Sequence, residues 1–180
     1  MKSALFLLLT LTSLTGQSQQ MQQQLTASQL DWRIINDGVM GGLSQSRMET
    51  GEQGLARFSG EVSLANNGGF ASTRAGLPEG AREGVAQISI RVKGDGKRYS
   101  LRLRPEGQYN RVSYRVYFDT APGEWQVHTF SLAEFTPTFR GRVLAEVPAI
   151  KGQTLEEIGL LVADEQEGAF ELLVDWIQVR

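Results

Sequence analysis

Residues 86–104 read AQISIRVKGDGKRYSLRLR, and apolar and polar side chains alternate on both sides of the central glycines. One face of this stretch carries only apolar or aromatic residues: Ile88, Ile90, Val92, Tyr99, Leu101 and Leu103. A period of two is typical of a β-strand with one buried face. The Asp-Gly pair within residues 94–97 predicts a tight turn, and therefore a plain β-hairpin.

The same alternation continues through most of the chain. Residues 112–119 place apolar and aromatic side chains opposite polar ones, and further strands are predicted at 124–130, 157–163 and 169–179. Short helical turns are expected only near 132–135 and 154–157. About nine or ten antiparallel strands in roughly 150 residues predict an all-β protein, a jelly-roll β-sandwich.

The first residues differ in character from the rest. A lysine at position 2 precedes an apolar run of about 11 residues, against the roughly 20 that a membrane-spanning helix needs. This pattern predicts a signal peptide over residues 1–18, followed by a flexible glutamine-rich leader over 19–30 and one domain over 31–180. We therefore expect a periplasmic or secreted protein without stable membrane insertion.

Composition narrows the possible chemistry. The 180 residues contain no cysteine, one histidine (His128) and a net charge of −2. Thiol catalysis, thiolate metal sites and multi-histidine sites are excluded, and the charge does not favour nucleic acid. His128 has no placed partner for a catalytic triad, so we expect a structural or surface role. We expect no catalytic activity, metal or cofactor.

Two other local features are expected to have structural rather than functional roles. Trp125 alternates with His128 and is expected in the core, on the opposite face of the same strand. The acidic pairs at 156–157 and 164–165 lie in polar stretches, and solvated turns are the better interpretation.

Two glycine-rich segments are candidates for ligand contacts. In residues 37–44 the Asp37 carboxylate and nearby backbone amides could face a ligand, or the segment could be a tight loop that closes one end of the sandwich. In residues 66–72, Asn66 and Asn67 beside Phe70 resemble a sugar-binding loop, although a turn explains the asparagines and glycines equally directly.

A third candidate is a charged face. If residues 98–104 pair with 112–119, their polar sides bring together Arg102, Arg104, Arg115 and Tyr117, with Arg91 and Lys93 as further members. Arginines interleaved with aromatics can recognise carboxylates, phosphates or an acidic protein surface. The alternative is a solvated face balanced by acidic side chains from neighbouring strands.

Several segments in order resemble one known family. They are Trp32 with residues 36–44, residues 58–60, 66–72, 94–99 and 125–126, Phe135, residues 139–142 and residues 168–172. From residue 32 to the end, the chain is similar to the complex I intermediate-associated protein 30 family. The resemblance implies a galactose-binding-like jelly roll and a non-catalytic assembly factor that acts as a chaperone for respiratory complex I intermediates.

Taken with the predicted signal peptide, the resemblance leads to a functional hypothesis. We expect an exported module that binds a protein partner in an assembly or chaperone role in the cell envelope. The alternative is a carbohydrate-binding module of the galactose-binding-like class.

Overall fold

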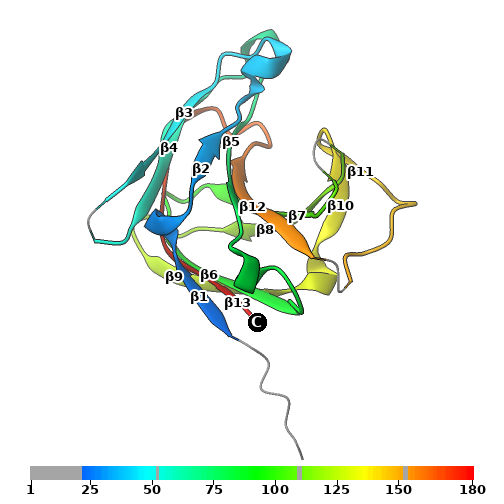
Figure 1. Cartoon of the computed structure of the whole chain (residues 1–180). Coiled ribbons are helices and arrows are strands. Elements are labelled where there is room, and N and C mark those ends of the chain that lie inside the picture. Colours follow the sequence, from blue (N-terminus) through cyan, green and yellow to red (C-terminus); the bar gives the residue numbers. More distant parts are fainter. Residues whose placement is uncertain (1–21, 52, 109–110, 152–153) are drawn as a thin grey trace, which may run out of the picture.

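The computed structural model describes residues 22–51, 53–108, 111–151 and 154–180. Its strands form two antiparallel sheets packed face to face (Figure 1). Sheet A has the order β3-β4-β13-β6-β9, with β1 also paired to β13, and sheet B has the order β11-β10-β8-β7-β12-β5-β2. The predicted all-β sandwich is confirmed, and thirteen strands are present in the described residues where nine or ten were expected.

The strands of sheet A are β1 (Gln23–Thr26), β3 (Gln45–Thr50), β4 (Ala56–Val62), β6 (Gln87–Lys93), β9 (Trp125–Ser131) and β13 (Gly168–Val179). Those of sheet B are β2 (Trp32–Ile34), β5 (Ala71–Gly76), β7 (Arg98–Pro105), β8 (Ser113–Asp119), β10 (Thr136–Phe139), β11 (Arg142–Val143) and β12 (Leu155–Val162). The connections include five single 3₁₀ turns: η1 (Ala27–Gln29), η2 (Asp37–Met40), η3 (Ala65–Asn67), η4 (Glu79–Ala81) and η5 (Leu132–Glu134). No helix in these ranges is long and apolar enough to span a bilayer.

The core lies between the two sheets. The inward faces predicted from alternation are buried, including Ile88 and Ile90 from sheet A and Tyr99 and Leu101 from sheet B. Burial of this apolar area drives the two layers together.

The predicted hairpin at residues 94–97 is wrong. β6 pairs with β13 and β9, whereas β7 pairs with β12 and β8, so this segment carries the chain from sheet A to sheet B. Asp95 fastens the crossing, because its carboxylate accepts hydrogen bonds from the Tyr99 hydroxyl (3.0 Å) and the backbone N–H of Glu171 (2.8 Å). The prediction was wrong because two strands that face the same core from opposite sheets have the same alternation of apolar and polar residues as the two strands of a hairpin.

Part of the predicted flexible leader is ordered. Residues 23–26 form β1 against the end of β13, and Leu25, Ala27 and Leu30 are buried. The Trp32 indole N–H donates to the Ala27 carbonyl at 2.8 Å. The domain therefore begins before residue 31. Residues 1–18, the predicted signal peptide, lie outside the described residues.

The face assignment of β9 is also corrected. Trp125 points away from the core, 36% exposed, with the Arg91 guanidinium 4.5 Å from its ring. His128 faces inward, with its ring centroid 4.9 Å from that of Phe118 and 6.2 Å from that of Phe130. Burial lowers the His128 pKa, although Asp119 opposes this. Of the structural and surface roles expected for His128, this packing favours the structural one.

Candidate functional site

A row of arginines crosses the outer face of sheet B. Register places Arg33 of β2 opposite Arg74 of β5, Arg74 opposite Gly159 of β12, Gly159 opposite Arg102 of β7, and Arg102 opposite Arg115 of β8. We call Arg33, Arg74, Arg102 and Arg115 the arginine row. Neighbouring strands are about 4.8 Å apart, so the row spans about 19 Å.

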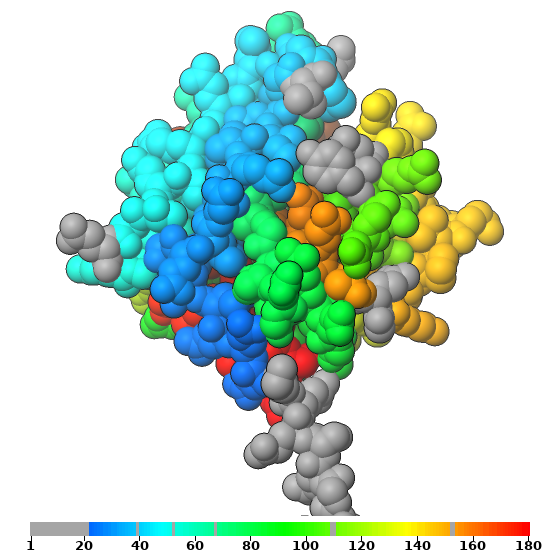
Figure 2. Space-filling model, viewed as in Figure 1, coloured from blue at the N-terminus to red at the C-terminus, as the bar shows by residue number. Residues whose placement is uncertain are grey.

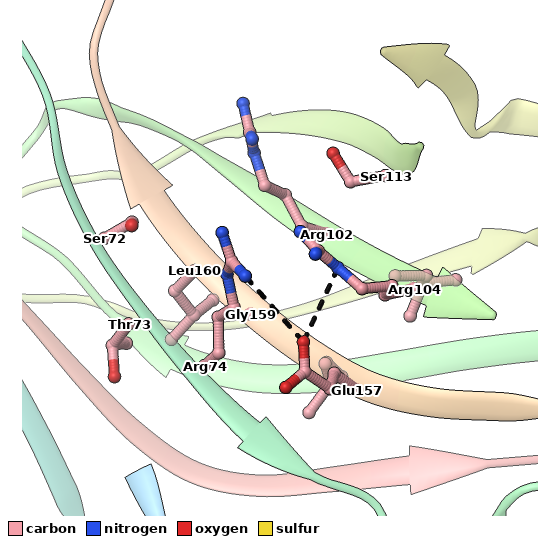
Figure 3. Close-up of a pocket in the computed structure, with 11 residues that line it drawn as sticks. Ser72, Thr73, Arg74, Arg102, Arg104, Ser113, Glu157, Gly159 and Leu160 are labelled. Atoms are coloured by element: carbon pink, nitrogen blue, oxygen red, sulfur yellow. Dashed lines mark ion pairs between the residues drawn. The ribbon is translucent and has the colours of Figure 1, made fainter. Parts of the chain in front are cut away.

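One carboxylate lies within this positive charge. The Glu157 side chain, only 5% exposed, forms ion pairs with Arg33, with Arg104 Nε at 3.5 Å and with Arg74 Nη1 at 3.9 Å. Figure 3 shows Arg74 and Arg104 turned towards this carboxylate. Residue 157 was predicted both to begin a strand and to belong to a solvated acidic turn; the strand is confirmed, and the solvated turn is wrong. Glu157 lies inside β12, buried by arginines from three other strands. Asp164 and Glu165 do form the expected turn.

Arg102 differs from the arginines around Glu157. Its side chain extends away from the Glu157 carboxylate (Figure 3), and its Nε is buried without a hydrogen-bond partner in the described part of the chain. Burial lowers the pKa of Arg102 to about 10, and the charges of Arg115, Arg74 and Arg104 act in the same direction. Like charges opposite one another destabilise a sheet, so this arrangement costs folding free energy.

The arginines border a recess in the sheet. The recess has a volume of about 310 Å³ and is open to solvent. Its lining includes Ser72, Arg74, Arg102, Arg104, Ser113 and Glu157. In the space-filling view the surface of β12 (orange) lies in the middle of this face, with the β10–β11 hairpin (yellow) at one edge (Figure 2). β12 therefore forms the floor and its neighbours supply the charge.

Tyr117 of β8 lies beside the row. The Arg98 and Arg115 guanidinium groups lie 4.1 and 4.9 Å from its ring centroid. Cation–π contact holds both arginines against this ring. The predicted grouping of Arg102, Arg104, Arg115 and Tyr117 on one face is thus found. Arg91 and Lys93 are not part of it, because β6 belongs to sheet A.

Asp37 has a structural environment. It is fully buried, and its carboxylate accepts hydrogen bonds from the backbone N–H groups of Ser44 (3.0 Å), Gly69 (2.7 Å) and Phe70 (3.2 Å), and from the Ser44 hydroxyl. Burial alone would raise the Asp37 pKa, but these hydrogen bonds together lower it. The carboxylate joins the two glycine-rich segments through donors of the protein itself, which favours the tight-loop alternative for residues 37–44.

The second glycine-rich segment adopts the turn that its sequence allowed. Asn66 is exposed and adopts φ = 56°, as a turn requires, and Phe70 is half-buried. Asn67 belongs to η3, and its side chain is outside what the structure describes. None of Asp37, Asn66 and Phe70 lines the recess beside the arginine row.

Comparison with known proteins assigns this chain to a family. Residues 18–174 match the profile of complex I intermediate-associated protein 30. The chain belongs to the complex I intermediate-associated protein 30 family. It is 24% identical over 168 residues to the mitochondrial complex I intermediate-associated protein 30 of Drosophila melanogaster, covering 81% of this chain and 57% of the fly protein. The chain thus spans less than two thirds of that relative.

This chain shares its fold with carbohydrate-binding modules of known structure. A family 11 carbohydrate-binding module of a Clostridium thermocellum cellulosomal cellulase is 15% identical with a TM-score of 0.63, over 83% of this chain and 87% of the module. The module in complex with a β-1,3-1,4-mixed-linked tetrasaccharide gives a TM-score of 0.64 at 15% identity, over 88% and 94%. At this identity the likeness establishes the fold alone.

In this family member, sequence reasoning missed Arg33, Arg74 and Glu157. Arg33 and Arg74 sit at polar positions of short strands, and nothing local distinguishes them from ordinary surface arginines. The available signal was Gly159: a glycine inside an apolar strand indicates close backbone approach. In the described ranges there is no cluster of three or more His, Asp or Glu side chains that could hold a metal.

Proposed function

We propose that this protein is a non-catalytic binding module that holds a polypeptide partner against the outer face of sheet B, in an assembly or chaperone role. Membership of an assembly-factor family supports a protein partner. The observation that carries the proposal is the charge imbalance on this face. The arginine row and Arg104 together supply five positive charges, and Glu157 is the acidic side chain among them.

Such an imbalance favours a negatively charged partner. Arg102 is buried next to other cations, a state that costs stability and that an incoming anion would relieve. Guanidinium groups form paired, charge-assisted hydrogen bonds with carboxylates. An acidic polypeptide segment is the partner that this chemistry fits within an assembly role.

A neutral glycan is the second candidate, and the fold shared with a tetrasaccharide-binding module favours it. Sugar-binding faces generally offer a free aromatic ring to the apolar side of a pyranose. Here the Tyr117 ring is already in contact with two guanidinium groups. Phe70 and Asn66 lie outside the recess. The acidic polypeptide is therefore the stronger candidate.

The test is a crosslinked pull-down in the native host, using the wild-type chain and the double variant Arg102→Gln/Arg115→Gln. The matched control, Arg47→Gln/Arg180→Gln, removes equal charge from β3 and from the residue after β13, outside sheet B. Loss of a partner with the first variant and retention with the control is the expected result. Identical partners for all three proteins would refute the role of this face, and a glycan array with neutral oligosaccharides tests the alternative.

We also propose that the protein acts in the cell envelope, because of the predicted signal peptide over residues 1–18. A C-terminally tagged full-length chain should be recovered in the periplasm or the medium. Leu7→Arg/Leu8→Arg, which interrupts the apolar run, should leave it in the cytosol. Cytosolic recovery of the unaltered chain would contradict export.

A further inference from the structure

We propose that the recess beside Arg102 and Arg104 is a binding site for one carboxylate, supplied by an Asp or Glu side chain of the partner. This inference rests on the proposed function and specifies the chemistry of the contact. It concerns the recess between β5, β12, β7 and β8, rather than the whole arginine row.

The arginines of this face already bind one carboxylate within the protein, that of Glu157. Arg33, Arg74 and Arg104 surround Glu157, although all three are distant from it in sequence. Glu157 offsets one of the positive charges, so the cluster keeps a positive excess. A second carboxylate would meet the same kind of guanidinium environment further along β7, at Arg102.

Two donors at the recess have no partner in the described residues: Arg102 Nε and Arg104 Nη1. The Arg104 side chain is 8% exposed, so bulk water does not solvate it freely. Buried polar groups are nearly always hydrogen-bonded, and an exception calls for an explanation such as a missing ligand. Both residues line the recess, and Ser113 adds a hydroxyl.

A carboxylate is favoured over a phosphate because the guanidinium groups around the recess already pair with one, that of Glu157. Glu157 lines the same recess, and its buried Oε2 has no hydrogen bond. A phosphate dianion would be attracted more strongly by the arginines and repelled more strongly by Glu157 than a monoanion, so the titrations below compare the two anions directly.

The experiment titrates the folded wild-type chain with four probes: a capped tetraglutamate peptide, the matched tetraglutamine peptide, inorganic phosphate and trigalacturonate. Isothermal calorimetry at two salt concentrations measures each affinity. We expect tetraglutamate to bind, tetraglutamine not to bind, and the affinity to fall as salt rises. Arg102→Gln should weaken binding about tenfold or more, because a hydrogen bond to a charged group is lost, whereas Arg47→Gln should change it less than about twofold.

Arg102→Lys keeps the charge but removes Nε and the planar fork, so it should bind tetraglutamate more weakly than wild type. Near-ultraviolet circular dichroism establishes that each variant is folded. Equal binding of the two peptides, tighter Arg102-dependent binding of phosphate, or binding of trigalacturonate without the peptide would each overturn the carboxylate site. If the pull-down partner still depends on Arg102 and Arg115 in that case, the proposed function stands without it. If tetraglutamate binds but the pull-down partners are identical for all variants, only the proposed function fails.

Discussion

At the scale of single residues, Asp37 shows how a predicted ligand group can be structural. Its carboxylate satisfies three backbone N–H groups from two loops. Asp37→Ala leaves these donors without a partner, and we expect the free energy of unfolding to fall by about 2–4 kcal/mol. Urea denaturation measures the change. Asp31→Ala, at an exposed position, is the control and should be nearly neutral; equal effects of both would contradict the role of Asp37.

The same carboxylate makes a pH prediction. The Asp37 pKa is lowered in the folded state from its ordinary value of 3.8. The charged form therefore contributes stability that is present above about pH 4 and is lost as pH falls through the lowered pKa. Between pH 5 and pH 2 the unfolding free energy of the wild type should fall more steeply than that of Asp37→Asn. Parallel curves would show that Asp37 is not coupled to folding.

Arg102 is predicted to limit stability. Its pKa of about 10, against an ordinary 12.5, reflects burial beside other cations. Arg102→Met removes the charge and keeps an apolar stem, so the unfolding free energy should rise by about 1–3 kcal/mol. Arg47→Met on exposed β3 should stay within about 0.5 kcal/mol of wild type. A destabilised Arg102→Met protein would indicate that the charge is compensated internally.

At the scale of elements, β12 joins the two halves of the arginine row. A Cβ on Gly159 would lie 2.8 Å from the Thr73 carbonyl oxygen of β5, so the glycine permits the close approach of these strands. We expect Gly159→Ala to lower the free energy of unfolding by about 1–3 kcal/mol. Gly76→Ala, in β5, is the matched control and should be nearly neutral, because no atom lies within 4 Å of the place its new methyl group would take. Thermal unfolding of both variants distinguishes close approach from a general effect of added methyl groups.

At the scale of the whole molecule, β1 and η1 belong to the sandwich. They and the residue that follows contribute Leu25, Ala27 and Leu30 to the core. A chain of residues 31–180 should therefore be less stable than one of residues 19–180 by about 3–6 kcal/mol. Urea denaturation of both chains checks this, and Leu25→Ala in the longer chain should produce part of the loss. Equal stability would restore the interpretation of residues 19–30 as a flexible leader.

The sequence predicted the positions of the strands well, but it predicted less well which strands pair with each other. Alternation identified β6 to β9 and β13 within a residue or two, and the pairing of β7 with β8 is as expected. The predicted pairing of β6 with β7 was wrong. An Asp-Gly turn between two alternating strands has the same sequence pattern in a hairpin and in a connection between two sheets. The prediction that Trp125 lies in the core was also wrong. Trp125 belongs to the edge strand β9, and its side chain packs on Arg91 outside the core.

Some residues of the candidate site were predicted from the sequence and others were not. Arg102, Arg104, Arg115 and Tyr117 were found because they alternate along two strands that are neighbours in sequence. Asp37 was ambiguous, since a buried carboxylate and a ligand-facing one have the same local sequence. Glu157 was misread as a solvated turn residue, because the arginines that bury it come from β2, β5 and β7.

By itself, the sequence determined the all-β class, the buried face of most strands and the family, because period-two alternation and motif order are local properties of the chain. Only the tertiary structure decided which sheet each strand joins. With that, it decided that Arg33, Arg74, Arg102 and Arg115 lie in one row, and that Glu157 is buried beside it. The physical reason is that the pairing of strands depends on packing over the whole core, and Arg33, Arg74, Arg102, Arg115 and Glu157 come from five strands of sheet B that are spread widely along the sequence.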